Sequence, residues 1–154
     1  RAGVVRSGVK STVGILAMMA MATTMQLAGM VTELSSAMAA LAGDLFPLIT
    51  PFIGALGAFR TGSNTNANVL LGAFQQQVAE TLGLYVPWIL AFHNAGAATG
   101  SVFSPAKIIV GCSTVGLSGS ESEALQRTMR YGLIIIAILA VLGLLVTRLL
   151  PPEL

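Results

Sequence analysis

The chain has 154 residues, of which 55% are hydrophobic and only 9% are charged. A soluble domain carries charge on about a quarter of its residues, so this composition excludes an ordinary soluble domain. The same balance excludes disorder, and a single cysteine excludes an internal disulfide framework and a cysteine-based zinc cluster. A net charge of +2 is too small to indicate a nucleic-acid-binding surface. The composition is that of a polytopic membrane protein.

The first segment of the chain combines a basic flank with an uncharged run. Arg1, Arg6 and Lys10 lie in the flank, which shows no signal-peptide pattern. Because the chain does not begin with methionine, we expect residues 1–154 to be the C-terminal fragment of a longer protein. Residues 11–31 carry no charge. About 20 apolar residues of helix cross a bilayer core of about 30 Å, so we predict a transmembrane helix there.

Residues 45–82 are predicted to form a re-entrant helical hairpin. The first arm contains Pro47 and Pro51 and ends at Arg60. It is apolar over only about 15 residues, which is too short for a full span. The run TGSNTNAN at 61–68 is small and polar throughout and forms the predicted tip, after which a second helical arm returns.

A broken transmembrane helix is predicted over residues 84–118. Ser104 and Pro105 form a helix-starting pair within it, with serine at the N-cap and proline at the first helical position. Gly96 and Gly100 have the GxxxG spacing that allows close helix approach, and we interpret them here as marking the break. Irregular backbone at membrane depth persists only where it is buried in protein or lines a cavity.

The last predicted transmembrane helix covers residues 121–149. The pattern from Ser120 to Glu123 fits a capping box, and the run after it is apolar without interruption. Basic residues favour the cytoplasmic side of a membrane. The basic N-terminal flank and the pair Arg127 and Arg130 therefore predict that the hairpin enters from outside and that the C-terminus lies outside.

Two helix starts at membrane depth are the strongest functional signal in the sequence. One follows the hairpin tip and the other is the Ser104-Pro105 pair. Each helix N-terminus presents about half a positive charge and several unpaired N–H groups. Together they form a site for a small anion, an arrangement that discontinuous transporter helices use for carboxylates. The alternative interpretation is that both are ordinary interfacial loops.

The motifs in these segments resemble the L-lactate permease family, bacterial symporters of 2-hydroxy acids with protons. The run TGSNTNANVL at 61–70 is similar to the hallmark of that family, and TGSVFSP at 99–105 and the Gly116-Leu117 turn fit it as well. The resemblance implies an all-α, multi-pass protein of the bacterial inner membrane, half of an inverted-repeat transporter. The Ser-Asn-Thr tip is also similar to tips of divalent anion/sodium symporters, within the wider ion transporter superfamily.

From this resemblance we predict secondary active transport of lactate- or glycolate-type 2-hydroxymonocarboxylates by proton symport and alternating access. The first alternative is a sodium-coupled carrier of organic anions. The second is a non-transporting anchor subunit, in which the polar segments 61–68 and 99–104 would have no function. We expect no enzyme activity, metal or cofactor. The expected partners are a small carboxylate, a proton or sodium ion and the lipid bilayer, without nucleic acid; a homo-oligomer is left open.

Candidate site residues come from the two polar segments and from nearby charges. The candidate substrate-binding residues are Ser63, Asn64, Thr65, Asn66, Thr99, Gly100, Ser101, Ser104, Arg60 and Lys107. The candidate proton carriers are His93, Asp44 and Glu80. Arg60 is a counter-ion of the substrate, a partner of Asp44 or Glu80, or a charge in a water-filled vestibule. Lys107 is unfavourable in the first turn of a helix unless an anion lies nearby. His93 titrates near physiological pH, although a lone histidine is more often structural.

Departures from the family pattern concern the cations. Relatives have an apolar residue where Arg60 stands and often have lysine where Ser101 stands. After the Ser-Pro pair they often have glutamine, where this chain has Ala106 and Lys107. These differences affect the choice of the cation that pairs with the substrate carboxylate.

Overall fold

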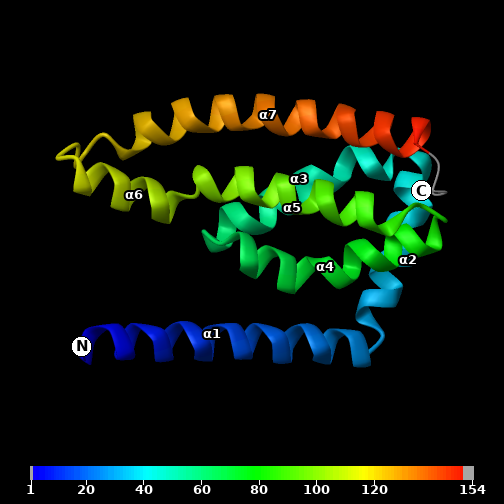
Figure 1. Cartoon of the computed structure of the whole chain (residues 1–154), viewed down its shortest axis with the longest axis horizontal. Helices are drawn as coiled ribbons and strands as arrows, with labels where there is room; N and C mark the ends of the chain where they lie inside the picture. The colour runs from blue at the N-terminus through cyan, green and yellow to red at the C-terminus, as the bar shows by residue number, and fades with distance from the viewer. Residues whose placement is uncertain (1, 151–154) are drawn as a thin grey trace.

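Helices make up all of the regular structure in the part of the chain that is described. The computed structural model describes the backbone of residues 2–150 and the side chains of residues 12–150. The elements are α1 (Ala2–Leu27), α2 (Met30–Ala42), the short 3₁₀ helix η1 (Gly43–Leu45), α3 (Phe46–Thr61), α4 (Asn64–Thr81), α5 (Val86–Val102), α6 (Pro105–Thr114) and α7 (Glu121–Leu149). Most run roughly along one direction, whereas α2 runs crosswise at one end (Figure 1).

The first helix ends earlier than the sequence predicts. α1 stops at Leu27, and Gly29 has a φ of +74°, in the left-handed region that favours glycine. A right-handed helix cannot continue through that backbone conformation. The predicted helix 11–31 is therefore divided, and Glu33 lies in the first turn of α2.

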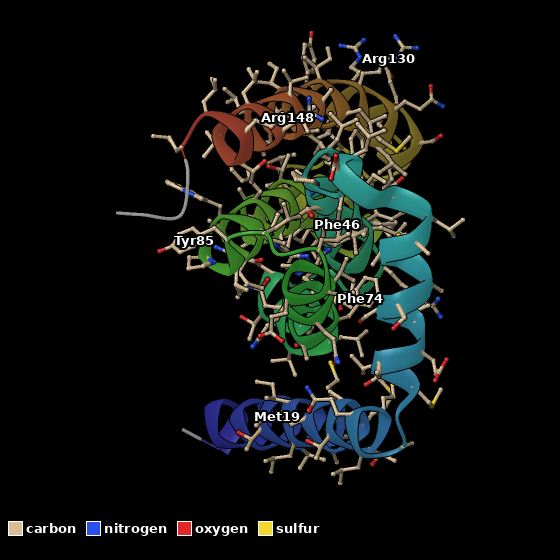
Figure 2. All side chains as sticks on the ribbon, turned by 90° about the vertical axis from the view of Figure 1, so that its right-hand side faces the viewer. Met19, Phe46, Phe74, Tyr85, Arg130 and Arg148 are labelled. Atoms are coloured by element: carbon tan, nitrogen blue, oxygen red, sulfur yellow. The ribbon has the colours of Figure 1, made fainter. Side chains whose placement is uncertain are left out.

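Two stretches among the described residues are long and apolar enough to cross a membrane by length and composition. They are Met30–Thr61 and Glu121–Leu149, while Thr12–Leu27 forms a shorter apolar helix. The first stretch consists of α2, η1 and α3 and changes direction at η1, as the two views show (Figures 1 and 2). In α7 the side chains of Ile134 and Ile138 are more than half exposed. A continuous exposed apolar face of this kind is typical of a surface that contacts lipid.

α3 and α5 pack backbone to backbone through glycines. A Cβ atom placed on Gly96 would lie 2.1 Å from the carbonyl oxygen of Pro51, and one on Gly100 would lie 2.3 Å from that of Ala55. The reciprocal contact is made by Gly54, where a Cβ would lie 2.1 Å from the carbonyl oxygen of His93. The GxxxG pair thus belongs to the α3–α5 interface, which corrects our interpretation that it marks the helix break.

Aromatic side chains fill the space beside that interface. Phe46 at the start of α3 is fully buried, and Phe74 of α4 belongs to the same core cluster (Figure 2). A second cluster joins Phe103, which follows α5, to Ala55 and Ile136. These clusters hold the hairpin, α5 and α7 in one bundle, whereas α1 lies to one side of it (Figure 2).

The helix arrangement contains a hairpin and an interrupted helix. α3 and α4 are joined at Gly62-Ser63 and pack together, since a Cβ on Gly57 would lie 2.8 Å from a methyl carbon of Leu71. α5 and α6 are separated by Phe103 and Ser104. Whether the hairpin re-enters the membrane, and whether an inverted repeat exists, stay predictions.

α7 covers residues 121–149, the range singled out in the sequence, but it starts without the predicted capping-box bonds. The Ser120 side chain makes no capping hydrogen bond. The Glu121 carboxylate instead accepts a hydrogen bond from the Gly119 N–H at 2.9 Å. Carboxylates are favourable at a helix N-terminus in either arrangement, because they offset the unpaired N–H groups.

Candidate functional site

The hairpin tip is a sharp turn with a conventional helix cap. Gly62 has a φ of +70°, which ends α3, and its N–H donates to the Ala58 carbonyl at 2.7 Å. Ser63 caps α4, because its hydroxyl accepts a hydrogen bond from the Asn66 N–H at 3.3 Å. The Thr61 hydroxyl donates to the Gly57 carbonyl at 2.9 Å. The turn is therefore fixed by its own hydrogen bonds.

The break between α5 and α6 leaves one hydroxyl unpaired. Pro105 has no N–H and favours extended backbone in the residue before it, and Ser104 has a ψ of 140°. Its carbonyl accepts from the N–H groups of Lys107 and Ile108. Its side chain is fully buried, and Oγ has no hydrogen-bond partner among the described residues. Ser104 thus occupies the predicted N-cap position without making the side-chain bond of a cap.

The tip and the break meet in the fold. A Cβ atom on Gly62 would lie 3.4 Å from Ser104 Oγ and 3.9 Å from the Ala106 Cβ. α4 and α6 both begin near this point and run away from it in opposite directions (Figure 1), so their N-termini lie close together. Both helix starts present unpaired N–H groups and partial positive charge, which favours an anion between them.

The predicted substrate-binding residues divide into those near this meeting point and those directed elsewhere. Thr65 is exposed, and Gly100 packs against α3. The Thr99 hydroxyl donates to the Ala95 carbonyl of its own helix at 2.9 Å, and Thr99 lines an apolar pocket with Tyr131 of α7. Neither Thr99 nor Gly100 is directed toward the tip.

The two predicted cations have different surroundings. Lys107 Nζ donates to Ser101 Oγ at 3.1 Å, which places the charge beside the break. Arg60 is exposed in the last turn of α3 and has no hydrogen bond or ion pair within the described part of the chain. Asp44 and Glu80 lie at the opposite ends of α3 and α4 from the tip. Pairing of Arg60 with either acid is therefore ruled out, because about 15 residues of helix, more than 20 Å, separate them.

The candidate proton carriers also differ in burial. Asp44 and Glu80 are exposed, and the Glu80 carboxylate accepts a hydrogen bond from Gln76 Nε2 at 2.8 Å. His93 is 1% exposed, and its ring lies against the Ala67 backbone without a hydrogen bond of normal geometry among the described residues. A buried group without a partner is unusual, so His93 stands out from the two acids.

An asparagine cluster joins α4 to α5, and Asn64 is the one member of it that the sequence analysis singled out. Asn68 Nδ2 donates to Asn94 Oδ1 at 2.7 Å and to Asn64 Oδ1 at 3.4 Å. Asn64 Nδ2 donates to the same Asn94 oxygen at 3.0 Å. The available signal was the spacing of Asn64 and Asn68, which places both amides on one face of a helix. The hydrogen bonds that Asn94 accepts cannot be predicted from the sequence, because they depend on how α5 packs against α4.

A pocket whose lining includes three amides and an imidazole adjoins this cluster, and we call it the polar pocket. Its volume is about 280 Å³, and it is lined by Asn68, Gly72, Gln76, Leu90, His93 and Asn94. Three larger pockets in the described part of the chain lie at α7 and have predominantly apolar walls. Among the described residues, no group of three or more histidine, cysteine, aspartate or glutamate side chains could hold a metal ion.

These features define the chain as part of a helical membrane protein with interrupted helices. The family model described as L-lactate permease matches residues 5–150. The chain belongs to the L-lactate permease family. It is 36% identical over 117 residues to glycolate permease GlcA of Escherichia coli (strain K12), covering 76% of this chain and 21% of that protein.

Two further relatives match the chain with similar identity. L-lactate permease of Bacillus subtilis (strain 168) is 36% identical over 117 residues, covering 76% of this chain and 21% of that protein. L-lactate permease of Escherichia coli (strain K12) is 37% identical over 100 residues, covering 65% and 18%. The chain thus spans about a fifth of the length of the curated relatives it matches. No solved structure matches it significantly.

Proposed function

We propose that this chain is the C-terminal part of a transporter that carries lactate- or glycolate-type 2-hydroxymonocarboxylates across the bacterial inner membrane by proton symport. The carrying observation is the meeting of the hairpin tip with the α5–α6 break, where buried Ser104 Oγ has no partner in the described structure. The printed names of the relatives, L-lactate permease and glycolate permease, support the substrate class.

In this proposal the carboxylate binds between the two helix starts. Ser63, Asn64 and Asn66 surround the start of α4, and Ser104 and Ser101 lie at the break, with Lys107 beside Ser101. N–H groups at helix starts favour an anion without a full positive charge that would hold it too tightly to release. The hairpin and the interrupted helix move together against the rest of the protein, since α3 and α5 share a glycine interface.

The proposed orientation agrees with the arrangement of the helix ends. The starts of α1 and α7 lie at the same end of the bundle (Figure 1), and they carry Arg6 and Lys10, and Arg127 and Arg130. That end would face the cytoplasm, where basic residues are favoured. The hairpin would then enter from the opposite side.

Uptake of labelled lactate and glycolate by the full-length permease in vesicles tests the proposed function. A pH gradient and a sodium gradient are imposed separately, and vesicles without the permease serve as the control. We expect uptake to follow the pH gradient and to persist in sodium-free buffer. Uptake that requires sodium would favour the sodium-coupled carrier, and no uptake of either acid would contradict the proposal.

Alanine substitutions at the tip are expected to weaken uptake of the acid. The changes are Ser63→Ala, Asn64→Ala and Thr65→Ala in the full-length permease. Loss of a hydrogen bond to a charged ligand costs about 1.5–3 kcal/mol, so the apparent affinity should fall about 10- to 100-fold. Because Thr65 is exposed and Asn64 is bonded to Asn94, we expect the serine change to have the clearest effect. Wild-type affinity in all three variants would remove the tip from the site.

Single cysteines at the two ends of the hairpin test its topology. Cysteine is introduced at Asp44 or Leu82 of the full-length protein in a Cys112→Ala background, and intact cells are treated with a membrane-impermeant thiol reagent. Both positions should be labelled from outside, because each lies at the end of the hairpin away from the tip. Labelling of the two positions from opposite faces would show that the segment crosses the membrane.

A further inference from the structure

The polar pocket between α4 and α5 has unpaired groups that the proposed anion site does not use. His93 is buried in its wall with its ring against the Ala67 backbone but without a hydrogen bond of normal geometry, and Asn68 Oδ1 is also buried and unpaired within the described structure. In the arrangement of the cluster, the Asn68 nitrogen donates to the oxygens of Asn94 and Asn64. The free atom of Asn68 is therefore an acceptor.

The surroundings of the pocket indicate that its occupant is polar. A Cβ atom on Gly72, in the pocket wall, would meet no atom within 4 Å, so the approach to that wall is open. By contrast, the outer face of α7 exposes isoleucine, leucine and valine side chains. A wall built from three amides and an imidazole is unfavourable against lipid, where polar groups find no hydrogen-bond partners.

A neutral imidazole offers one N–H donor and one acceptor nitrogen, and the Asn68 oxygen adds another acceptor. A carboxylate accepts hydrogen bonds only, whereas a hydroxyl on the neighbouring carbon can donate one. The pairing of a donor with a separate acceptor in one pocket therefore matches an acid that carries a 2-hydroxyl group. A water molecule takes about 30 Å³, so the pocket has room for a three-carbon acid together with several waters.

We propose that this pocket is a second binding position for the 2-hydroxy acid, in which Asn68 reads the hydroxyl. The acid's hydroxyl donates to Asn68 Oδ1, and His93 donates its N–H to the carboxylate. Because the unpaired atoms lie beneath the pocket surface, binding includes rotation of these two side chains toward the acid. The inference rests on the proposed function and assigns discrimination between hydroxylated and plain acids to this pocket, in addition to the anion site between the two helix starts.

Competition against uptake of labelled lactate by the full-length permease tests the assignment. The competitors are unlabelled lactate and propionate, which lacks the hydroxyl. In the wild type we expect lactate to compete about tenfold better than propionate, the effect of one hydrogen bond. Asn68→Ala should abolish this preference by weakening lactate alone, while His93→Leu should weaken both acids, because both carry the carboxylate.

Gln77→Ala is the matched control. It removes an amide from the same helix, but Gln77 donates to Thr32 Oγ1 at 3.3 Å and does not line the pocket. The preference for lactate should be unchanged in this variant, and the amount of each variant in the membrane is measured with an affinity tag. A preference that persists in Asn68→Ala at normal abundance would overturn the assignment.

A measurement on the wild-type protein covers the case in which Asn68→Ala does not fold. Fluorine is close to a hydroxyl in size but cannot donate a hydrogen bond, so 2-fluoropropionate should compete no better than propionate. Competition equal to that of lactate would overturn the role of Asn68 as acceptor. If the wild type takes up neither lactate nor glycolate, the proposed function itself fails, and the pocket assignment fails with it.

Discussion

Gly96→Ala and Gly100→Ala are each expected to prevent normal folding of the permease. A single methyl group at Gly96 would lie 2.1 Å from the Pro51 carbonyl oxygen, and one at Gly100 would lie 2.3 Å from that of Ala55. Both obstacles are backbone atoms of α3, which cannot rotate away as a side chain can. Overpacking of a core usually costs about 1–3 kcal/mol, and we expect these two changes to reach or exceed about 3 kcal/mol.

The measurement is the melting temperature and monodispersity of the full-length protein in detergent, together with its abundance in the membrane. Gly111→Ala is the control, because a Cβ there meets no atom within 4 Å. Alanine is the better helix former by about 1 kcal/mol, so this variant should be as stable as the wild type or slightly more stable. Equal melting temperatures for Gly96→Ala and Gly111→Ala would contradict the close α3–α5 contact.

The same glycines show where sequence reasoning reaches its limit. The GxxxG spacing correctly indicates close approach of a helix, but the spacing does not say which helix approaches. Local signals at the starts of α6 and α7 are more informative. Pro105 starts a helix because proline fits the first helical position, and Glu121 starts one after a glycine-rich turn. The sequence-based prediction places the end of the first helix too late, at residue 31, because nothing in the apolar run marks the left-handed conformation of Gly29.

The candidate site was predictable to a similar degree. The polar tip and the Ser104-Pro105 break stand out because polar residues interrupt apolar stretches, and the structure brings them together. The asparagine cluster depends on the register between α4 and α5, which one sequence does not reveal. The pairing of Arg60 with Asp44 could be excluded from the sequence, because the helical arm predicted between them already places the two residues more than about 20 Å apart.

Arg60→Glu is expected to weaken lactate uptake by the full-length permease more than the neutral change Arg60→Leu. Arg60 lies two residues before Gly62, next to the proposed carboxylate site, and is exposed without a partner in the described structure. Removing its attraction for the carboxylate, as in Arg60→Leu, should lower the apparent affinity about tenfold, the effect of one charge-assisted hydrogen bond. Reversing the charge adds repulsion of the anion, so the loss should reach about 100-fold.

Stability and salt dependence distinguish this role from a structural one. As a cation in the last turn of α3, Arg60 favours the helix by only about 0.3–1 kcal/mol, so Arg60→Leu should leave the melting temperature almost unchanged. The affinity that remains should depend less on external salt, because an exposed charge has been removed. Arg148→Leu is the matched control, an exposed arginine in the last turn of α7 at the other end of the bundle, and it should bind lactate normally. If Arg60→Leu and Arg60→Glu both bind lactate as well as the Arg148 variant does, Arg60 is a solvated helix-end charge, and Lys107 at the break becomes the remaining candidate for the cation that pairs with the substrate.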